Sequence, residues 1–539
     1  MSTPLTVKAG ATVADDIQVG SFFLETLTTG MYEDPFHCIR EYVQNGFDAI
    51  QDAIRSGIMK NDDGRILISI DRTSRIASLS VRDNGIGIPA AKAFSTLVSL
   101  GASRKTPAYH AGFRGIGRLA GTAYCTTLRF TTKARSENVA TVVDFDCGLL
   151  RGYFSPGAEP IDIRDVVRAS VKTRPIVENE TEHFTQVDMI GLVNLGLEFI
   201  EPGRLHPYLQ QVCPVEYSDN FEFADRVRGL STSFGERLGV VHVETRQKRE
   251  RVSIHKAYKN SYPTGRKNSV SKLHNVEVFS SKQNGWFGWI GVSNFPGEIV
   301  DETAAGVRFR VKNIQIGDSS IIESLAEELT VAGSERRLQR WAVGEIFVTN
   351  TQVVPNARRD GFEDSDAWRA IRRDVREQVV KRVIKLIRSA STTRSALKTL
   401  ADALGGVSEA LAAQSITPQE KSKLSSDIKR HILTLSSPDK LLGADPKDVS
   451  SLISKFKEMQ ERLERFKVQE PPPPEDSTKT EEQTAAADSS GNNSNEESAE
   501  GVERGVLDVV LEILQAEFGD TKAAQILRLI EAKLDEEGL

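Results

Sequence analysis

The sequence predicts an α+β protein of several domains, and three observations lead to this prediction. Residues 1–195 alternate helical and strand patterns, and residues 196–365 contain a second set of strand patterns. Residues 366–468 change to long helices rich in Arg, Lys, Glu, Leu and Ala. A chain of 539 residues is too long for one hydrophobic core, because single cores stop growing at about 250–300 residues. We expect a two-layer α/β domain, an α/β middle domain and a helical region, in that order.

The composition is that of an ordinary globular protein. Hydrophobic residues make up 39% and charged residues 27%, and the net charge of −6 argues against a chain that binds polyanions over its whole surface. No apolar run approaches the roughly 20 residues that span a bilayer, and the start of the chain is not typical of a secretory signal. The four cysteines form no C-x-x-C pair, which favours reduced thiols. We expect a cytoplasmic protein with no membrane partner.

The first domain contains the clearest local patterns. Apolar residues at helical spacing predict a helix over residues 36–56. Residues 65–72 and 77–83 alternate apolar and polar side chains and predict two strands with one buried face each. A glycine-rich stretch follows at residues 101–121, and more strands come after it.

The middle domain is predicted from short runs of β-branched and aromatic residues bounded by glycine. These runs cover residues 238–244, 285–294, 306–317 and 344–350. They justify the second α/β domain expected over residues 196–365.

One helix of the 366–468 region carries a repeating apolar pattern. Its apolar residues are spaced 3-4-3-4-3 and comprise Val449, Leu452, Phe456, Met459, Leu463 and Phe466. This spacing is typical of a coiled-coil seam, which would make the region a dimerisation element. An ordinary helix packed on a neighbour shows the same spacing, so the sequence leaves both interpretations open.

The C-terminal part of the chain changes character twice. Residues 469–503 have few apolar groups and much Pro, Ser, Asn and Glu, so we expect a disordered linker. Residues 504–539 predict a helical hairpin, with a break at Gly519 and Asp520. Two short helices bury too little surface to be stable alone, so the hairpin is expected to dock on a partner or on its own copy.

The helix over residues 36–56 carries the first chemical motif. Glu41, Asn45 and Asp48 recur at i, i+4 and i+7, which puts them on one helical face. The residues expected to face the core are Ile39, Val43, Phe47 and Ile50. Alone, this polar spacing is also typical of a solvated helix face.

Two further motifs follow in the same domain. A predicted strand ends at Asp83, and Gly85 and Gly87 after it would let a flat ligand approach the backbone closely, although D-x-G-x-G alone is more often a plain turn. Ser103 and Lys105 then precede a glycine-rich run at residues 112–121. Glycines at this density before a helix place several N–H groups around an anion.

In this order, the motifs E-x-x-x-N-x-x-D-A, D-x-G-x-G and G-x-x-G-x-G resemble those of the GHKL ATPases, the superfamily of Hsp90, gyrase B and MutL. Residues 15–50 are similar to the opening of Hsp90 in pattern and in distance to the Glu-Asn-Asp helix. The resemblance covers roughly residues 10–362. It implies a Bergerat-type two-layer α/β sandwich that binds ATP with Mg²⁺.

The resemblance implies a role for each matched residue. Glu41 would be the general base that polarises the attacking water, Asn45 would ligate Mg²⁺, and Asp83 would accept from the adenine amino group. Thr185 would lie beside the adenine. The other residues expected to bind ATP, mostly through a lid over the phosphates, are Asp48, Gly85, Gly87, Ser103, Lys105, Gly112, Phe113, Arg114, Gly115, Ile116 and Gly117.

A segment of the middle domain extends the resemblance. Residues 354–364, VPNARRDGFED, are similar to the catalytic loop of the Hsp90 middle domain, in which an arginine reaches the γ-phosphate. The match falls on Arg359, with Arg358 as a close competitor. An arginine there would neutralise charge in the transition state. The alternative is an ordinary surface pair of cations.

Residues 245–267 form a basic stretch with Tyr258 and Tyr262 among the cations. This composition would suit a nucleic acid or an acidic partner. A solvated mobile loop explains it more simply.

The sequence thus predicts an Hsp90-like, Mg-ATP-dependent ATPase that works as a nucleotide-switched clamp, a homodimer acting on protein clients. The first alternative is a nucleic-acid-associated clamp similar to MutL or MORC proteins. The second is a nucleotide-binding signalling module without turnover. Glu41 argues against that module, because binding alone requires no base.

Overall fold

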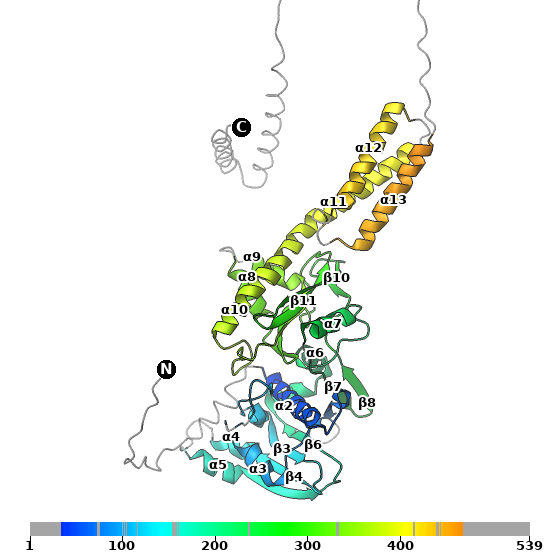
Figure 1. Cartoon of the computed structure of the whole chain (residues 1–539). Coiled ribbons are helices and arrows are strands. Elements are labelled where there is room, and N and C mark those ends of the chain that lie inside the picture. Colours follow the sequence, from blue (N-terminus) through cyan, green and yellow to red (C-terminus); the bar gives the residue numbers. More distant parts are fainter. Residues whose placement is uncertain are drawn as a thin grey trace, which may run out of the picture. The chain divides into compact units, whose positions relative to one another are not determined.

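The structure is a computed structural model that describes residues 34–466 apart from short gaps. The gaps are residues 73–75, 100, 102, 104, 116, 154–158, 160, 236–237, 330–333, 413–415, 438–440 and 442–443. The predicted linker 469–503 and hairpin 504–539 lie outside the described residues. The described part has the mixed α+β fold that the sequence predicts, with a sheet domain followed by a second sheet and then by helices (Figure 1).

Helix α2 (Phe36–Arg55) and strands β1 (Arg65–Asp71) and β2 (Ser78–Asp83) confirm the local predictions for the first domain. The four apolar residues expected to face the core are all buried, at most 3% exposed: Ile39, Val43, Phe47 and Ile50. They pack on the buried face of β1 and β2, whose side chains alternate between buried and partly exposed. One face of the sheet is thus covered by helices, as in a two-layer sandwich.

The first sheet has eight strands in the order β5-β4-β3-β6-β2-β1-β7-β8. Its other strands are β3 (Cys125–Lys133), β4 (Val139–Asp146), β5 (Val171–Val177), β6 (Phe184–Leu192), β7 (His242–Gln247) and β8 (Glu250–Ile254). The helical segments between them are η1 (Asn61–Asp63), α3 (Ala90–Val98), η2 (Gly117–Ala123), α4 (Cys147–Tyr153), α5 (Ile163–Ser170) and η3 (Asn194–Ile200).

Strands β7 and β8 join the first sheet although they come from the segment expected to form the middle domain. Strand β7 pairs in parallel with β1, so that Ile66 lies beside Val243 and Ile68 beside Thr245. Val243 is buried in the same core as Ile66 and Ile68. The first sheet therefore extends beyond residue 195. Strand β7, which begins at His242, completes the edge of β1.

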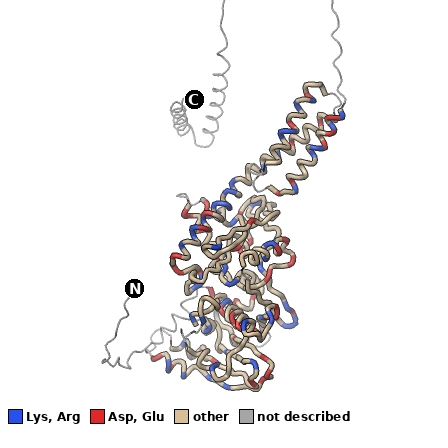
Figure 2. Tube along the Cα trace, in the orientation of Figure 1, with Lys and Arg blue, Asp and Glu red and all other residues tan. Residues whose placement is uncertain are grey.

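The basic stretch 245–267 is not a mobile loop but part of β7, β8 and β9 (Ser261–Pro263). Tyr258 and Tyr262 are buried in the core of the next domain, so neither is on the surface to stack on a base. Four exposed cations of the stretch lie along the β7–β8 hairpin, where Figure 2 shows blue at the sheet edge: Arg246, Lys248, Arg249 and Arg251. The other exposed cations, Lys259, Arg266 and Lys267, follow later in the stretch.

The second sheet has six strands in the order β13-β12-β14-β11-β10-β9. The other strands are β10 (Val270–Ser281), β11 (Trp286–Ser293), β12 (Gly306–Val311), β13 (Ile314–Ile316) and β14 (Val343–Val348). The helical segments around it are α6 (Pro202–Val212), α7 (Ala224–Phe234), α8 (Ser320–Glu327), α9 (Ser334–Leu338) and η4 (Gln339–Trp341). Strand β11 is buried on both faces, because α7 packs on one face and α8 and the following helices pack on the other.

The 366–468 region is helical, as predicted, and comprises α10 (Asp366–Val375), a π-helical turn η5 (Arg376–Val380), α11 (Lys381–Ala412), α12 (Pro418–Leu435) and α13 (Pro446–Arg465). Figure 1 shows α11, α12 and α13 side by side. The six apolar residues of the 3-4 pattern pack with α11 and α12 of the same chain, and Phe456 and Leu463 are buried there. The pattern therefore serves packing within this chain.

No helix in the described part of the chain is long and apolar enough to cross a membrane. The four cysteines are free and buried.

Candidate functional site

Helix α2 lines a cavity of about 800 Å³ in the first domain. Glu41 and Asn45 face this cavity one helical turn apart, as their i, i+4 spacing predicts. Of the other predicted residues, those that line the cavity are Asp83, Gly87, Ser103, Lys105, Gly112, Phe113, Arg114, Gly115, Gly117, Thr185 and Arg359. This volume lies within the range of about 300–1,000 Å³ that small-molecule sites occupy.

Asp83 is the last residue of β2 and lies at the apolar end of the cavity. Its side chain is buried, and Oδ1 accepts a hydrogen bond from the Gly85 N–H at 2.8 Å. Burial raises the pKa of Asp83 to about 7, although the backbone N–H groups of Gly85 and Thr185 oppose the shift. A buried carboxylate at this position is a specific acceptor for an amino group on a flat ligand.

Two neighbours shape the space around Asp83. Gly87 has φ 67°, and a Cβ there would lie 1.8 Å from the carbonyl oxygen of Lys133, so only glycine fits. Thr185 pairs with Asp83 across β2 and β6, and its hydroxyl lies 3.0 Å from the hydroxyl of Thr132. Both residues line the cavity beside Asp83, where the resemblance implies that the adenine would lie.

Asp48 organises the segment above the cavity and is not among the residues that line it. Its buried carboxylate accepts from the backbone N–H groups of Ala111 at 2.7 Å and Gly112 at 2.9 Å, and pairs with Lys105 Nζ at 3.1 Å. These contacts tie residues 105–112 to α2. Asp48, which the resemblance implies to be an ATP-binding residue, thus contacts residues 105–112 through its carboxylate.

The glycine-rich segment passes directly over Glu41. A Cβ on Gly117 would lie 2.2 Å from Glu41 Oε2, so this position permits no side chain without moving the carboxylate. Gly115 has φ 75° and passes close to Ser103. Ile116 lies outside the described residues. The backbone of the glycine-rich segment therefore lies against the Glu41 carboxylate at the wall of the cavity.

Arg359 enters the cavity from the loop between β14 and α10. It is 5% exposed, and its Nε donates to Glu41 Oε1 at 3.1 Å while Nη2 donates to the Ala111 carbonyl at 2.6 Å. The backbone of Arg359 has φ 59°, a conformation that costs an arginine of order 1 kcal/mol or more. The strained backbone thus occurs at the residue whose side chain contacts the Glu41 carboxylate.

Other contacts hold the arginine loop (residues 355–360) against the first domain. Arg114 donates to the carbonyls of Pro355 at 2.9 Å and Asn356 at 3.2 Å, and it also pairs with Glu363. Arg40 donates to the carbonyl of Arg358 at 3.0 Å. The Arg358 residue itself is exposed, so the two adjacent arginines differ in position and Arg359 is the one that enters the site.

Several residues of the site are not apparent from the motifs. Arg118 and Ala357 line the cavity, and burial lowers the pKa of Arg118. Arg118 lies within the glycine-rich run, directly after Gly117, and this position could have identified it from the sequence as a site residue. Arg40 stands beside Glu41, but its bond to the arginine loop depends on a contact across 318 residues that no local pattern reveals.

The protein offers few metal-binding atoms around Asn45, so a cation bound there would be held mainly by phosphate and water. Within the described residues no group of three or more His, Cys, Asp or Glu side chains is placed to hold a metal ion. Asn45 offers one hard oxygen beside Glu41 in the cavity. Mg²⁺ commonly takes one or two protein oxygens together with phosphate and water, so this sparse set fits Mg²⁺ brought by a nucleotide.

Residues 32–148 match a protein family described as histidine kinase-, DNA gyrase B-, and HSP90-like ATPase. The comparison with curated proteins found no match. The matched segment includes Glu41, Asn45, Asp83 and the glycine-rich segment, but it ends before Thr185 and before the arginine loop. In its N-terminal domain, this chain is therefore similar to the nucleotide-binding ATPases of the GHKL superfamily.

Proposed function

We propose that this protein is a Mg-ATP-dependent ATPase that works as a nucleotide-switched clamp, with the arginine loop as the part that moves on nucleotide binding. The observation that carries the proposal is the contact between Arg359 and Glu41, at 3.1 Å in a buried site. It joins the helix of the ATPase motif to a loop that lies outside the matched family segment.

In this proposal the cavity binds ATP with its base at Asp83 and its phosphates under residues 103–117. Glu41 accepts a proton from the attacking water, and Asn45 supplies a protein oxygen to Mg²⁺, which would neutralise phosphate charge. Arg359 is the one cation from the second domain that reaches Glu41 among the described residues. A guanidinium there stabilises charge that develops on the transferred phosphoryl group.

The ion pair also explains how turnover would depend on nucleotide. While Arg359 donates to Glu41, the carboxylate oxygen Oε1 is engaged with the guanidinium and is not available to an attacking water. A γ-phosphate carries more negative charge than one carboxylate and would attract Arg359 away from Glu41. The base and the cation would then both be in position only when ATP is present.

The presence of Glu41 beside Arg359 favours turnover over a signalling module that binds nucleotide without hydrolysis. The test is a steady-state assay of phosphate release with the full chain, comparing wild type with Glu41→Gln. If the wild type releases no phosphate, the signalling module is the better proposal.

For the biological role, we propose chaperone-like remodelling of protein clients in the cytoplasm. The second candidate is a nucleic-acid-associated clamp, which is favoured by the exposed cations Arg246, Lys248, Arg249 and Arg251 on the β7–β8 hairpin. The burial of Tyr258 and Tyr262 weakens it, because no aromatic ring of that stretch is available for stacking.

The two roles are separated by the ATPase rate in the presence of each partner. The chaperone role requires that an unfolded protein alters the rate and that DNA and RNA do not. The nucleic-acid role requires stimulation by DNA that weakens steeply with salt and disappears when the four hairpin cations are replaced by Gln.

We also propose that the protein is a homodimer. Because the 449–466 pattern packs on α11 and α12 of its own chain, the dimer contact would come from other surfaces of these helices or from residues 504–539. Light scattering on a chain ending at residue 466 distinguishes them, since a monomer there would assign dimerisation to the segment beyond it.

A further inference from the structure

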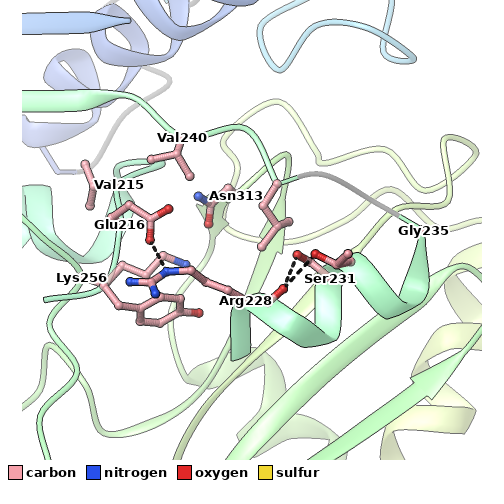
Figure 3. A pocket seen from close by; sticks show the side chains of 11 residues that line it. Val215, Glu216, Arg228, Ser231, Gly235, Val240, Lys256 and Asn313 are labelled. Atoms are coloured by element: carbon pink, nitrogen blue, oxygen red, sulfur yellow. Dashed lines mark hydrogen bonds and ion pairs between the residues drawn. The ribbon is translucent and has the colours of Figure 1, made fainter. Parts of the chain in front are cut away.

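A second cavity lies in the middle domain and shares no lining residue with the cavity around Glu41. Its volume is about 460 Å³. It is bounded by residues 215–217, by α7 and by the turn between β12 and β13 (Figure 3). None of the ATPase motifs explains it.

The floor of this second cavity carries excess positive charge. Lys256 lines it and pairs with the fully buried Glu345 at 2.8 Å, and Arg310 pairs with the same carboxylate. Tyr217 and Trp289 also donate to Glu345. Two buried cations therefore share one carboxylate. Burial is the main cause, and the charge of Arg310 the second, that lowers the pKa of Lys256 to about 7.

The charges on the wall of the second cavity are partly exposed, so solvent screens them. Glu216 and Arg228 pair with each other at 3.0 Å, as Figure 3 shows, and Arg228 also pairs with the exposed Asp225. The buried cluster of Lys256, Arg310 and Glu345 therefore has an excess of positive charge whenever Lys256 is protonated. An anionic group near Lys256 would favour that protonated form, because oppositely charged groups stabilise each other strongly where water is scarce.

A hydrogen-bond acceptor faces the same space without a partner. Asn313 is 1% exposed and lines the second cavity. Its Nδ2 donates to the carbonyl of Gly239 at 3.1 Å, whereas Oδ1 has no hydrogen-bond partner. Leaving a buried acceptor unpaired costs about 1–3 kcal/mol, which a ligand with a donor would recover.

The apolar part of the remaining wall comes from Val215, Tyr217, Leu238 and Val240, and Ser231 and Thr232 of α7 add two hydroxyl groups. We propose that this second cavity binds a small organic acid, with the carboxylate directed to Lys256, an N–H or O–H donor directed to Asn313 and an apolar chain against Leu238 and Val240. The proposal does not depend on nucleotide binding.

The same turn connects this site to the ATPase domain. Lys312 precedes Asn313, and its Nζ donates to the carbonyl of Ala108 at 2.6 Å, in the segment between Lys105 and Ala111. Lys312 and Asn313 have φ 50° and 64°, so they form a tight two-residue turn in which one residue cannot shift without the other. An acid bound to Asn313 would therefore alter the affinity for nucleotide, and nucleotide would alter the affinity for the acid by the same factor.

The binding test uses the full chain and N-acetylleucine, which has a carboxylate, an amide donor and an apolar side chain. Its neutral amide, N-acetylleucinamide, is the matched ligand control. We expect N-acetylleucine to bind in calorimetry at millimolar concentration and to raise Tm, and the neutral amide to bind at least about tenfold more weakly. Equal binding of the two compounds, or no binding of the acid, would overturn the proposal.

Two variants locate the binding. Asn313→Asp keeps the shape but places a negative charge beside the carboxylate, so the affinity for the acid should fall about tenfold or more. The matched control Asn220→Asp adds the same charge at an exposed position and should leave the affinity unchanged. Leu238→Phe, which fills the space, should also abolish binding while Tm without ligand shows that the protein is folded. Unchanged affinity in both cavity variants contradicts the site.

The connection to the lid has its own measurement. Lys312→Ala should bind N-acetylleucine as well as the wild type, but the acid should no longer change the affinity for a non-hydrolysable ATP analogue. An effect of the acid that persists in Lys312→Ala would show that the coupling does not pass through this turn. If ATP analogues do not bind at all, the proposed ATPase function fails while the acid-binding result stands.

Discussion

Arg359 and Glu41 are 318 residues apart in the chain, and yet the guanidinium Nε lies 3.1 Å from the carboxylate Oε1 in a buried site. Their neighbours are arranged to support this contact, since Asp48 fixes Ala111, whose carbonyl accepts from Arg359. The pair connects a helix of the ATPase motif with a loop of the middle domain. In the proposed ATPase, substitutions of this pair should therefore separate nucleotide binding from turnover.

Arg359→Ala should lower ATP turnover by about 10³-fold or more while nucleotide affinity changes little, because the cation acts on the transition state. Arg358→Ala is the matched control and should have a much smaller effect, since Arg358 is exposed and offers its carbonyl to Arg40. Single-turnover assays and calorimetry measure the two quantities. A larger loss of turnover in Arg358→Ala would show that Arg358, and not Arg359, is the catalytic arginine.

Glu41→Gln should retain ATP binding and lower turnover by about 10²–10⁴-fold, the usual contribution of a positioned base. Asn45→Ala should instead lose the part of ATP affinity that depends on Mg²⁺, because it removes a hard oxygen ligand. Binding measured with and without EDTA distinguishes the two variants. Wild-type turnover in Glu41→Gln would mean that another group is the base.

ATP should bind much more tightly than GTP near and above pH 8. The adenine amino group donates to Asp83, whereas guanine presents an oxygen acceptor that would leave the buried carboxylate unpaired at a cost of about 1–3 kcal/mol or more. Asp83→Asn should weaken ATP binding severely. Calorimetry with both nucleotides is the measurement, and equal affinities in the wild type would contradict the role of Asp83.

The pH dependence follows from the pKa of Asp83, which burial raises to about 7. Adenine needs the ionised carboxyl, so ATP affinity should fall by up to about tenfold per pH unit below pH 7. A protonated Asp83 can donate to guanine, so the preference for ATP over GTP should narrow there.

The same raised pKa has the opposite effect on stability. The folded protein holds a proton on Asp83 that the unfolded chain releases above its ordinary pKa of 3.8. The contribution to the free energy of unfolding is therefore largest below pH 3.8 and is lost as pH rises through about 7. Asp83→Asn should remove both pH effects, which urea titrations between pH 4 and pH 8 and binding curves between pH 6 and pH 8 would check.

Glu345→Gln should destabilise the protein by about 3–5 kcal/mol, because it leaves Lys256 and Arg310 buried without their anion. Burial alone would raise the pKa of Glu345, but Lys256 and Arg310 lower it to about 2, so the carboxylate is ionised at neutral pH. Glu216→Gln is the control, since its pair with Arg228 is partly exposed and should contribute at most about 1 kcal/mol. Urea denaturation measures both.

The sequence predicts the parts of this site that depend on local spacing. Glu41 and Asn45 share a helical face because 3.6 residues make one turn, and Asp83 ends a strand because the apolar alternation stops there. Gly87 needs a positive φ, and this requirement appears in the sequence as a glycine.

Contacts between distant segments could not be predicted in this way. The spacing of Asp48 is the same whether it contacts a ligand or the N–H groups of Ala111 and Gly112. The 3-4 pattern of Phe456 and Leu463 is likewise the same for packing within a chain and between chains. The resemblance to the Hsp90 loop named Arg359 and Arg358, but only the fold shows which of them is buried.

The pairing of β7 with β1 constrains how the two domains can move. It runs over six residue pairs, from Arg65 with His242 to Ile70 with Gln247, while the arginine loop and the hydrogen bond from Lys312 to Ala108 attach the same domain at two further places. Breaking a parallel ladder of six pairs costs far more than releasing one loop or one exposed hydrogen bond. In the proposed clamp, β7 would therefore stay attached to β1 and act as the axis, and mechanical work drawn from ATP would appear as rotation about β7.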